Sequence, residues 1–344
     1  MKLLEVQELV TTFKTGRGMI KAINGVDFEV DEGERVALVG ESGCGKSVTM
    51  QSVLRLYDER KLVRYSGKIN YKNRDLLGLP QKEMRNIRGR EIAMVFQDAL
   101  SALDPIFTVE DQISESLKLH QGLSGRAARE AAAEMLQLVG ISEPYRRLGQ
   151  YPFELSGGMR QRVMIAVALS CKPALLIADE PTSALDVTIQ AQIMELIMEL
   201  NRKLGMAVIL ITHDLAIVAE TCTRALVMYL GQIVEEAPVE DLFVSPRHPY
   251  TLALLKSIPK ISGERPERLY AIDGMVPQLD NIPAGCRFSP RCPLAEERCR
   301  RENPPLVSLR AASQPAAQAT SQAAAQKTLH RSRCWRTKDI GGTS

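Results

Sequence analysis

One short stretch of glycines, a lysine and a serine constrains the fold of this chain most strongly. Residues 40–47 read Gly-Glu-Ser-Gly-Cys-Gly-Lys-Ser, which fits the pattern G-x-x-x-x-G-K-[ST]. An apolar, strand-like run at residues 35–39 precedes it, and a helical pattern follows to about residue 56. In this context the pattern predicts a loop between a buried strand and a helix, with backbone N–H groups that bind phosphate.

The predicted phosphate-binding loop also indicates its ligand. Lys46 is expected to contact the β- and γ-phosphates of ATP, and Ser47 to offer its hydroxyl to Mg²⁺. The alternative is a structural glycine turn beside a surface lysine, and the matching strand and helix disfavour it. The residues expected around the triphosphate are Gly40, Glu41, Ser42, Gly43, Cys44, Gly45, Lys46, Ser47 and Val48.

Two adjacent acids follow a second strand pattern. Asp179 and Glu180 come directly after the apolar run at residues 174–178, at the carboxyl end of a strand, where α/β proteins bind ligands. Asp179 is expected to hold Mg²⁺ through water, and Glu180 to act as general base on the attacking water. An isolated Asp-Glu pair often only faces solvent, but the phosphate-binding loop favours the catalytic interpretation.

The remaining pattern predicts an α/β protein with an appendage. Apolar runs at residues 174–178 and 208–212 flank a helical pattern at residues 189–204, which indicates a βαβ unit. Helical patterns between residues 108 and 170 indicate an insertion. We expect a nucleotide-binding domain over residues 1–258, with its helical subdomain at about 100–170. A second domain is expected over residues 259–344, with a low-complexity segment at residues 311–326.

Composition narrows the classes of function. The chain has 344 residues and a net charge of +3, which gives no indication of nucleic-acid binding. Its longest apolar runs fall far short of the ~20 residues that cross a bilayer. The N-terminus becomes polar before any run of signal-peptide length, so we expect a cytoplasmic protein. The seven cysteines are an odd number, which argues against a disulfide framework.

The sequence Leu-Ser-Gly-Gly-Met-Arg-Gln-Arg at residues 155–162 resembles the signature motif of ABC ATPases. This resemblance implies a P-loop NTPase fold with a RecA-like core, an antiparallel β subdomain and a helical subdomain. In that family Ser156, Gly157 and Gly158 lie at a helix N-terminus and close on the γ-phosphate bound by the opposite subunit. Standing alone, the same residues would be an ordinary helix cap.

Shorter matches agree with this family. Gln97 follows a strand pattern at residues 92–96 and resembles the Q-loop, residues 183–186 resemble the D-loop, and His213 resembles the switch histidine. Phe13 lies where the family stacks an aromatic ring on adenine, although a phenylalanine near a strand end is as typical of a core. The resemblance assigns catalysis to Lys46, Gln97, Glu180 and His213, and Mg²⁺ binding to Ser47, Gln97 and Asp179.

Two C-terminal segments indicate the branch of the family. Residues 245–255 and 285–293 resemble parts of the ATPase subunits of dipeptide and oligopeptide ABC importers, a group that includes nickel and glutathione systems. The resemblance implies a peripheral protein at the cytoplasmic face of the inner membrane. Its implied partners are a related second ATPase subunit, two transmembrane permeases and an extracytoplasmic peptide-binding protein. A nickel or glutathione importer, or more remotely a soluble ABC ATPase without a permease, remain alternatives.

A group of cysteines marks the predicted C-terminal domain: Cys286, Cys292, Cys299 and Cys334. In a reducing compartment such thiolates suit an iron–sulfur cluster or zinc. Some importers of this group carry a 4Fe-4S cluster on such cysteines, so the resemblance favours a cluster, with zinc or free thiols as alternatives. The low-complexity segment separates Cys334 from the other three.

Overall fold

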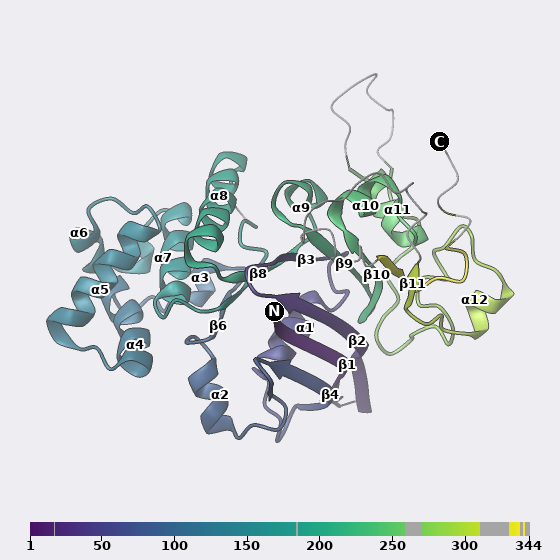
Figure 1. Cartoon of the computed structure of the whole chain (residues 1–344), viewed down its shortest axis with the longest axis horizontal. Coiled ribbons are helices and arrows are strands. Elements are labelled where there is room, and N and C mark those ends of the chain that lie inside the picture. Colours follow the sequence, from purple (N-terminus) through teal and green to yellow (C-terminus); the bar gives the residue numbers. More distant parts are fainter. Residues whose placement is uncertain (17, 184, 259–269, 310–329, 338–339, 341–344) are drawn as a thin grey trace, which may run out of the picture. The chain divides into compact units, whose positions relative to one another are not determined.

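The structure is a computed structural model, and it describes residues 1–16, 18–183, 185–258, 270–309, 330–337 and 340 (Figure 1). The low-complexity segment at residues 311–326 lies outside these described residues. The chain divides into two compact units, and each unit is built from several segments of sequence. Unit 1 comprises Met1–Glu5, Glu29–Arg35 and Asn70–Ile211, and unit 2 comprises Val6–Phe28, Val36–Ile69 and Thr212–Ser344.

A parallel sheet forms the core of unit 1. Its strand β7 (Leu175–Asp179) pairs on one side with β6 (Ile92–Val95) and on the other with β8 (Ala207–Thr212). All residues of β7 and β8 are buried, which explains their unbroken apolar sequences. Helix α8 (Val187–Leu204) connects these two strands. The predicted βαβ unit is therefore present, and its helix begins two residues before the predicted start at residue 189.

A group of helices makes up much of the remainder of unit 1 (Figure 1). Thr108 begins one of them with a capping box, in which its hydroxyl accepts a hydrogen bond from the backbone N–H of Asp111. Two smaller elements, β5 (Arg74–Asp75) and α2 (Gln81–Ile87), precede this group. The group consists of α3 (Ala99–Ala102), α4 (Val109–Gln121), α5 (Gly125–Leu138), α6 (Pro144–Leu148), the 3₁₀ helix η1 (Pro152–Glu154) and α7 (Gly157–Leu169).

Unit 2 has a sheet to which distant parts of the sequence contribute. Strand β3 (Arg35–Val39) lies parallel to β9 (Arg224–Tyr229), and β9 pairs antiparallel with β10 (Gln232–Pro238). Beyond β10 come β12 (His330–Ser332) and β11 (Val307–Leu309), both in antiparallel pairing. The C-terminal residues therefore extend the same sheet that carries the strand before the glycine-rich loop.

Unit 2 also contains further strands and helices. Strands β1 (Lys2–Thr15), β2 (Gly18–Asp31) and β4 (Val63–Tyr71), most of whose residues belong to unit 2, are neighbours in a second sheet in the order β2-β1-β4. The helices are α1 (Lys46–Val53), α9 (Leu215–Thr221), α10 (Val239–Val244), α11 (Pro249–Lys256) and α12 (Glu297–Arg301). In the part of the chain that the structure describes, no helix has both the length and the apolar character of a membrane span.

Candidate nucleotide-binding site

The glycine-rich loop of unit 2 connects β3 to α1, as the sequence predicts. Its first glycine, Gly40, has a φ of +153° and runs close to β9. A Cβ atom at this position would lie 2.3 Å from the carbonyl oxygen of Met228 and 2.8 Å from the sulfur of Cys44. Only glycine fits such an approach without displacing backbone, so the sheet fixes the point at which the loop begins.

Lys46 folds back over this loop. Its ammonium group donates hydrogen bonds to the carbonyl oxygens of Gly40, at 2.8 Å, and Glu41, at 3.1 Å, and the side chain is buried. Half-buried Ser47 follows in the first turn of α1, whose N-terminus carries the partial positive charge of the helix dipole. A buried ammonium, a helix N-terminus and a glycine-rich loop are features suited to binding phosphate.

Glu41 of the loop is held by residues that the sequence analysis did not identify. Its backbone N–H donates to the hydroxyl of Tyr250 at 2.8 Å. Its carboxylate accepts two hydrogen bonds from the guanidinium of Arg291, at 2.6 and 3.0 Å. Nothing in the sequence around Glu41 indicates these partners, because both come from the C-terminal part of unit 2.

His213 and Phe13 also belong to unit 2. His213 is exposed directly after β8, and the next residue, Asp214, caps α9 by accepting a hydrogen bond from the N–H of Ala216 at 2.8 Å. The ring of Phe13 is half-buried and meets the ring of Tyr57 edge-on, with 4.8 Å between centroids. The expected roles of His213 at the γ-phosphate and of Phe13 at adenine stay predictions.

In unit 1 the predicted acids lie at the end of β7, beside the predicted Q-loop residue. Asp179 is the last residue of the strand and is buried. The carboxylate of Glu180 accepts a hydrogen bond from the side-chain amide of Gln97 at 2.8 Å. The hydroxyl of Ser183 donates to the backbone carbonyls of Gln97 and Glu180. The structure thus joins the predicted base, Gln97 and the first D-loop residue in one hydrogen-bonded group.

The predicted signature motif begins helix α7 of unit 1. Ser156 caps the helix by accepting a hydrogen bond from the N–H of Met159 at 3.4 Å, and Ser156 and Gly157 are exposed. Gly158 lies against α8, because a Cβ atom there would be 2.9 Å from the side chain of Ile189. The motif therefore presents a helix N-terminus to solvent, as an anion-binding site requires.

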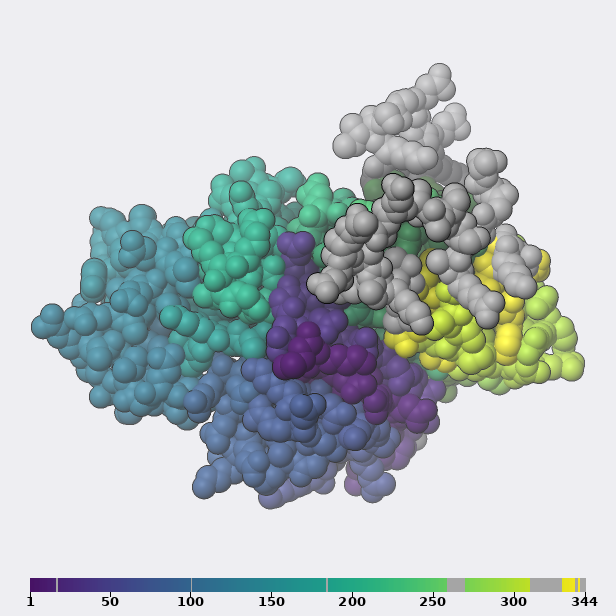
Figure 2. Space-filling model, viewed as in Figure 1, coloured from purple at the N-terminus to yellow at the C-terminus, as the bar shows by residue number. Residues whose placement is uncertain are grey.

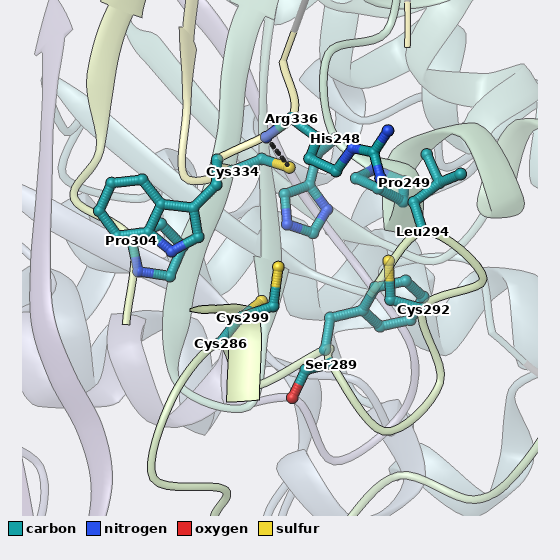
Figure 3. Close-up of a pocket in the computed structure, with 12 residues that line it drawn as sticks. His248, Pro249, Cys286, Ser289, Cys292, Leu294, Cys299, Pro304, Cys334 and Arg336 are labelled. Carbon is teal, nitrogen blue, oxygen red and sulfur yellow. Dashed lines mark hydrogen bonds between the residues drawn. The ribbon is translucent and has the colours of Figure 1, made fainter. Parts of the chain in front are cut away.

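A cavity in unit 2 is lined by the four clustered cysteines, Cys286, Cys292, Cys299 and Cys334 (Figure 3). None of them forms a disulfide. His248, the cap of α11, and Trp335 line the same cavity, and burial lowers the pKa of His248 to about 3. Among the described residues, no group of three or more His, Cys, Asp or Glu side chains is arranged to hold a metal ion.

Comparison with known proteins places this geometry in a family. The ABC transporter family matches residues 23–183, and the oligopeptide/dipeptide transporter C-terminal region matches residues 234–299. A probable peptide ABC transporter ATP-binding protein, y4tR of Sinorhizobium fredii, is 48% identical over 98% of this chain and 96% of its own length. The oligopeptide transport ATP-binding protein AppD of Bacillus subtilis is 50% identical over 89% of this chain and 92% of its own.

Solved structures agree with the sequence comparisons. The ATP-binding cassette MJ0796, solved as a dimer in a post-hydrolysis state with ADP and Pi, is 30% identical, with a TM-score of 0.61. The match covers 69% of this chain and 98% of that one. The fold and site thus define an ABC-type ATPase that uses ATP and Mg²⁺, which confirms the predicted fold class. The chain belongs to the family of ATP-binding subunits of ABC transporters, in the branch with the oligopeptide/dipeptide transporter C-terminal region.

Proposed function

We propose that this chain hydrolyses ATP to energise the import of dipeptides or oligopeptides across the cytoplasmic membrane. The observation that carries the proposal is the match of residues 234–299 to the oligopeptide/dipeptide transporter C-terminal region, beside an intact set of ABC ATPase motifs. The names of y4tR and AppD, both described as peptide or oligopeptide systems, support the same cargo. A nickel or glutathione importer is the alternative within this group.

The phosphate-binding loop is assigned the triphosphate. Lys46 would exchange its bonds to the loop carbonyls for the β- and γ-phosphates, and the N–H groups of residues 40–48 would donate to phosphate oxygens. Ser47, Asp179 and Gln97 would hold Mg²⁺, which supplies positive charge to the phosphates. Phe13 would stack on adenine. The buried ammonium of Lys46 supports this assignment, because phosphate oxygens would give it charged acceptors in place of carbonyl oxygens.

Glu180 is assigned the role of general base. Its carboxylate would accept the proton of the attacking water as the γ-phosphate leaves, while His213 contacts that phosphate. The hydrogen bond from Gln97 fixes one carboxylate oxygen of Glu180, which orients the other. By its resemblance to the Q-loop, Gln97 would also sense the membrane partner, so this hydrogen bond would link that partner to the base.

Each ATP is proposed to be bound by two subunits. The exposed N-terminus of α7, with Ser156, Gly157 and Gly158, would donate to the γ-phosphate held by the phosphate-binding loop of a second ATPase subunit. The dimeric form of the cassette MJ0796 supports this assembly.

We assign the second subunit to a related chain, with a second copy of this chain as the alternative. The complex also needs two transmembrane permeases and an extracytoplasmic peptide-binding protein, with this chain peripheral at the cytoplasmic face.

The cysteine cavity is proposed to hold a 4Fe-4S cluster, with zinc as the alternative. Backbone hydrogen bonds act on Cys286 from Phe288 and Ser289, and the N–H of Arg336 donates to the sulfur of Cys334 at 3.3 Å. Such donors stabilise thiolates and tune clusters. Cys286, Cys292, Cys299 and Cys334 would hold the cluster through their thiolates, because all four line the same cavity. The cluster would tie together the C-terminal domain that the sequence predicts over residues 259–344.

Burial indicates how these thiols behave without a bound group. Burial raises the pKa of Cys292 to about 11 and that of Cys334 to about 12, so both thiols are neutral near pH 7. Binding of iron or zinc would release their protons. Iron and sulfide analysis of anaerobically purified protein tests the assignment. Finding zinc instead would select the alternative, and finding neither would refute a metal role for the cavity.

The cargo is tested with the assembled transporter. Co-expression with the permeases and binding protein, purification and reconstitution into vesicles allow uptake of labelled dipeptide to be compared with uptake of nickel and glutathione. We expect ATP-dependent accumulation of the peptide. Accumulation of nickel or glutathione alone would exclude peptide as the cargo but leave the ATPase assignment intact.

A further inference from the structure

Arg291 connects the C-terminal part of unit 2 to the phosphate-binding loop. Its side chain is only 4% exposed, although it carries a charge and lies 250 positions from Glu41 in sequence. Burial of a charged group is unfavourable unless its hydrogen-bond donors all find acceptors. The acceptors around Arg291 therefore indicate what the buried charge holds in place.

The guanidinium of Arg291 meets acceptors from three segments. Two nitrogens donate to the two carboxylate oxygens of Glu41, in the bidentate geometry that arginine allows and lysine does not. The remaining contacts reach the carbonyl oxygens of Ile272 and Asp273 and, at 3.4 Å, the hydroxyl of Tyr229 on β9. Arg291 thus anchors Glu41 to the C-terminal segment and to the central sheet of unit 2.

Glu41 in turn contacts Lys46, the residue expected to bind the β- and γ-phosphates. The Glu41 carbonyl accepts a hydrogen bond from the Lys46 ammonium, and its N–H is fixed by Tyr250. Arg291 completes this set by holding the side chain. With its backbone N–H, its carbonyl and its carboxylate all engaged, Glu41 has little freedom to move within the loop.

Charge gives a second reason for the pairing. Glu41 places a carboxylate within a loop that binds a triphosphate, and like charges at short range repel. The guanidinium of Arg291 neutralises this carboxylate by direct contact. Removal of the guanidinium alone would leave a negative charge next to the phosphates, whereas removal of both partners would not.

We infer that Arg291 is a positioning residue for ATP: through Glu41 it holds the phosphate-binding loop in its binding conformation and cancels a charge that would repel the triphosphate. This inference rests on the assignment of residues 40–47 to the triphosphate. It concerns binding rather than bond cleavage, so its effect belongs in the Kd and KM for ATP and not in kcat.

The test is a double-mutant cycle on the purified chain, with the fluorescent nucleotide mant-ATP as the probe. We expect Arg291→Gln to raise the Kd about tenfold, because charge-assisted hydrogen bonds contribute that much or more. In the assembled transporter kcat at saturating ATP should stay within about twofold. Glu41→Gln combined with Arg291→Gln should bind mant-ATP more tightly than Arg291→Gln alone, because no lone carboxylate remains, but less tightly than the wild type, because the bidentate contact is lost in both variants.

A matched control separates this effect from a general loss of arginine. Arg301 of α12 also pairs with a glutamate, Glu297, but its side chain is 75% exposed. We expect Arg301→Gln to leave the Kd unchanged. The inference is overturned if Arg291→Gln binds mant-ATP as tightly as Arg301→Gln, or if the double variant binds no better than Arg291→Gln alone.

Two further variants allow the inference to be tested even if Arg291→Gln does not fold, and separate it from the assignment of the loop. If Arg291→Gln does not fold, Arg291→Lys takes its place, because it keeps the charge but loses the bidentate contact, and an unchanged Kd would then overturn the inference. Lys46→Ala tests the assignment of the loop independently. Loss of binding in Lys46→Ala with normal binding in the Arg291 variants would refute the inference alone, and normal binding in Lys46→Ala would refute the loop assignment itself.

Discussion

Gly40 offers a direct test of whether packing against the sheet of unit 2 fixes where the phosphate-binding loop begins. We predict that Gly40→Ala strongly destabilises the protein. The added methyl group would lie 2.3 Å from the backbone oxygen of Met228, a distance that real Cβ atoms do not show. That oxygen belongs to β9, which is paired on both sides, so it cannot move away without disrupting the sheet.

The size of the effect follows from two contributions. A non-glycine residue in a rarely populated backbone conformation such as φ +153° costs about 1–3 kcal/mol. Overpacking against fixed neighbours adds about 1–3 kcal/mol. The sum, about 2–6 kcal/mol, is a large fraction of the ~5–15 kcal/mol by which a protein is usually stable.

Urea unfolding of the purified chain measures this change in the free energy of unfolding. The matched control is Gly149→Ala, because Gly149 has an ordinary φ of −78° and its nearest neighbour to an added methyl is 3.9 Å away. We expect the control to lie within about 0.5 kcal/mol of the wild type. If Gly40→Ala were as stable as Gly149→Ala, the account of the loop geometry would be wrong.

Two other substitutions test the assigned roles in unit 1. Glu180→Gln should lower kcat for ATP hydrolysis by about 10²–10⁴ with little change in nucleotide affinity, because it removes the general base; full activity in a steady-state ATPase assay would contradict that role. Ser156→Ala should destabilise α7 by about 0.5–2 kcal/mol in urea unfolding, because it removes the helix cap. An unchanged unfolding curve would show that the cap contributes nothing.

Local sequence determined the parts of the fold that were predicted correctly. The strand, loop and helix around residues 40–47 could be predicted because the glycines and the lysine that a phosphate-binding loop requires lie within eight consecutive residues. Helix α8 was predicted for the same kind of reason, although its start was placed two residues late. Asp186 sets that start, because its carboxylate accepts a hydrogen bond from the N–H of Ile189 at 3.0 Å.

Contacts between distant segments could not be predicted in this way. Arg291 reaches Glu41 across 250 positions, and no periodicity links the two residues. The pairing of β12 with β10 also joins distant segments, and it brings Cys334 to the cavity of the other three cysteines despite the intervening low-complexity segment. The sequence therefore indicated candidate residues for binding ATP, but not the distant residues that contact the glycine-rich loop.

Uptake by the reconstituted transporter tests the central claim most directly. Vesicles that contain this chain with its permeases, its partner ATPase and the binding protein are supplied with labelled dipeptide and with ATP on the side of the ATPases. The account predicts accumulation of peptide that requires ATP and disappears when Glu180→Gln replaces the wild-type chain. Peptide accumulation that continues unchanged with the variant, or ATP hydrolysis without any peptide uptake, would contradict it.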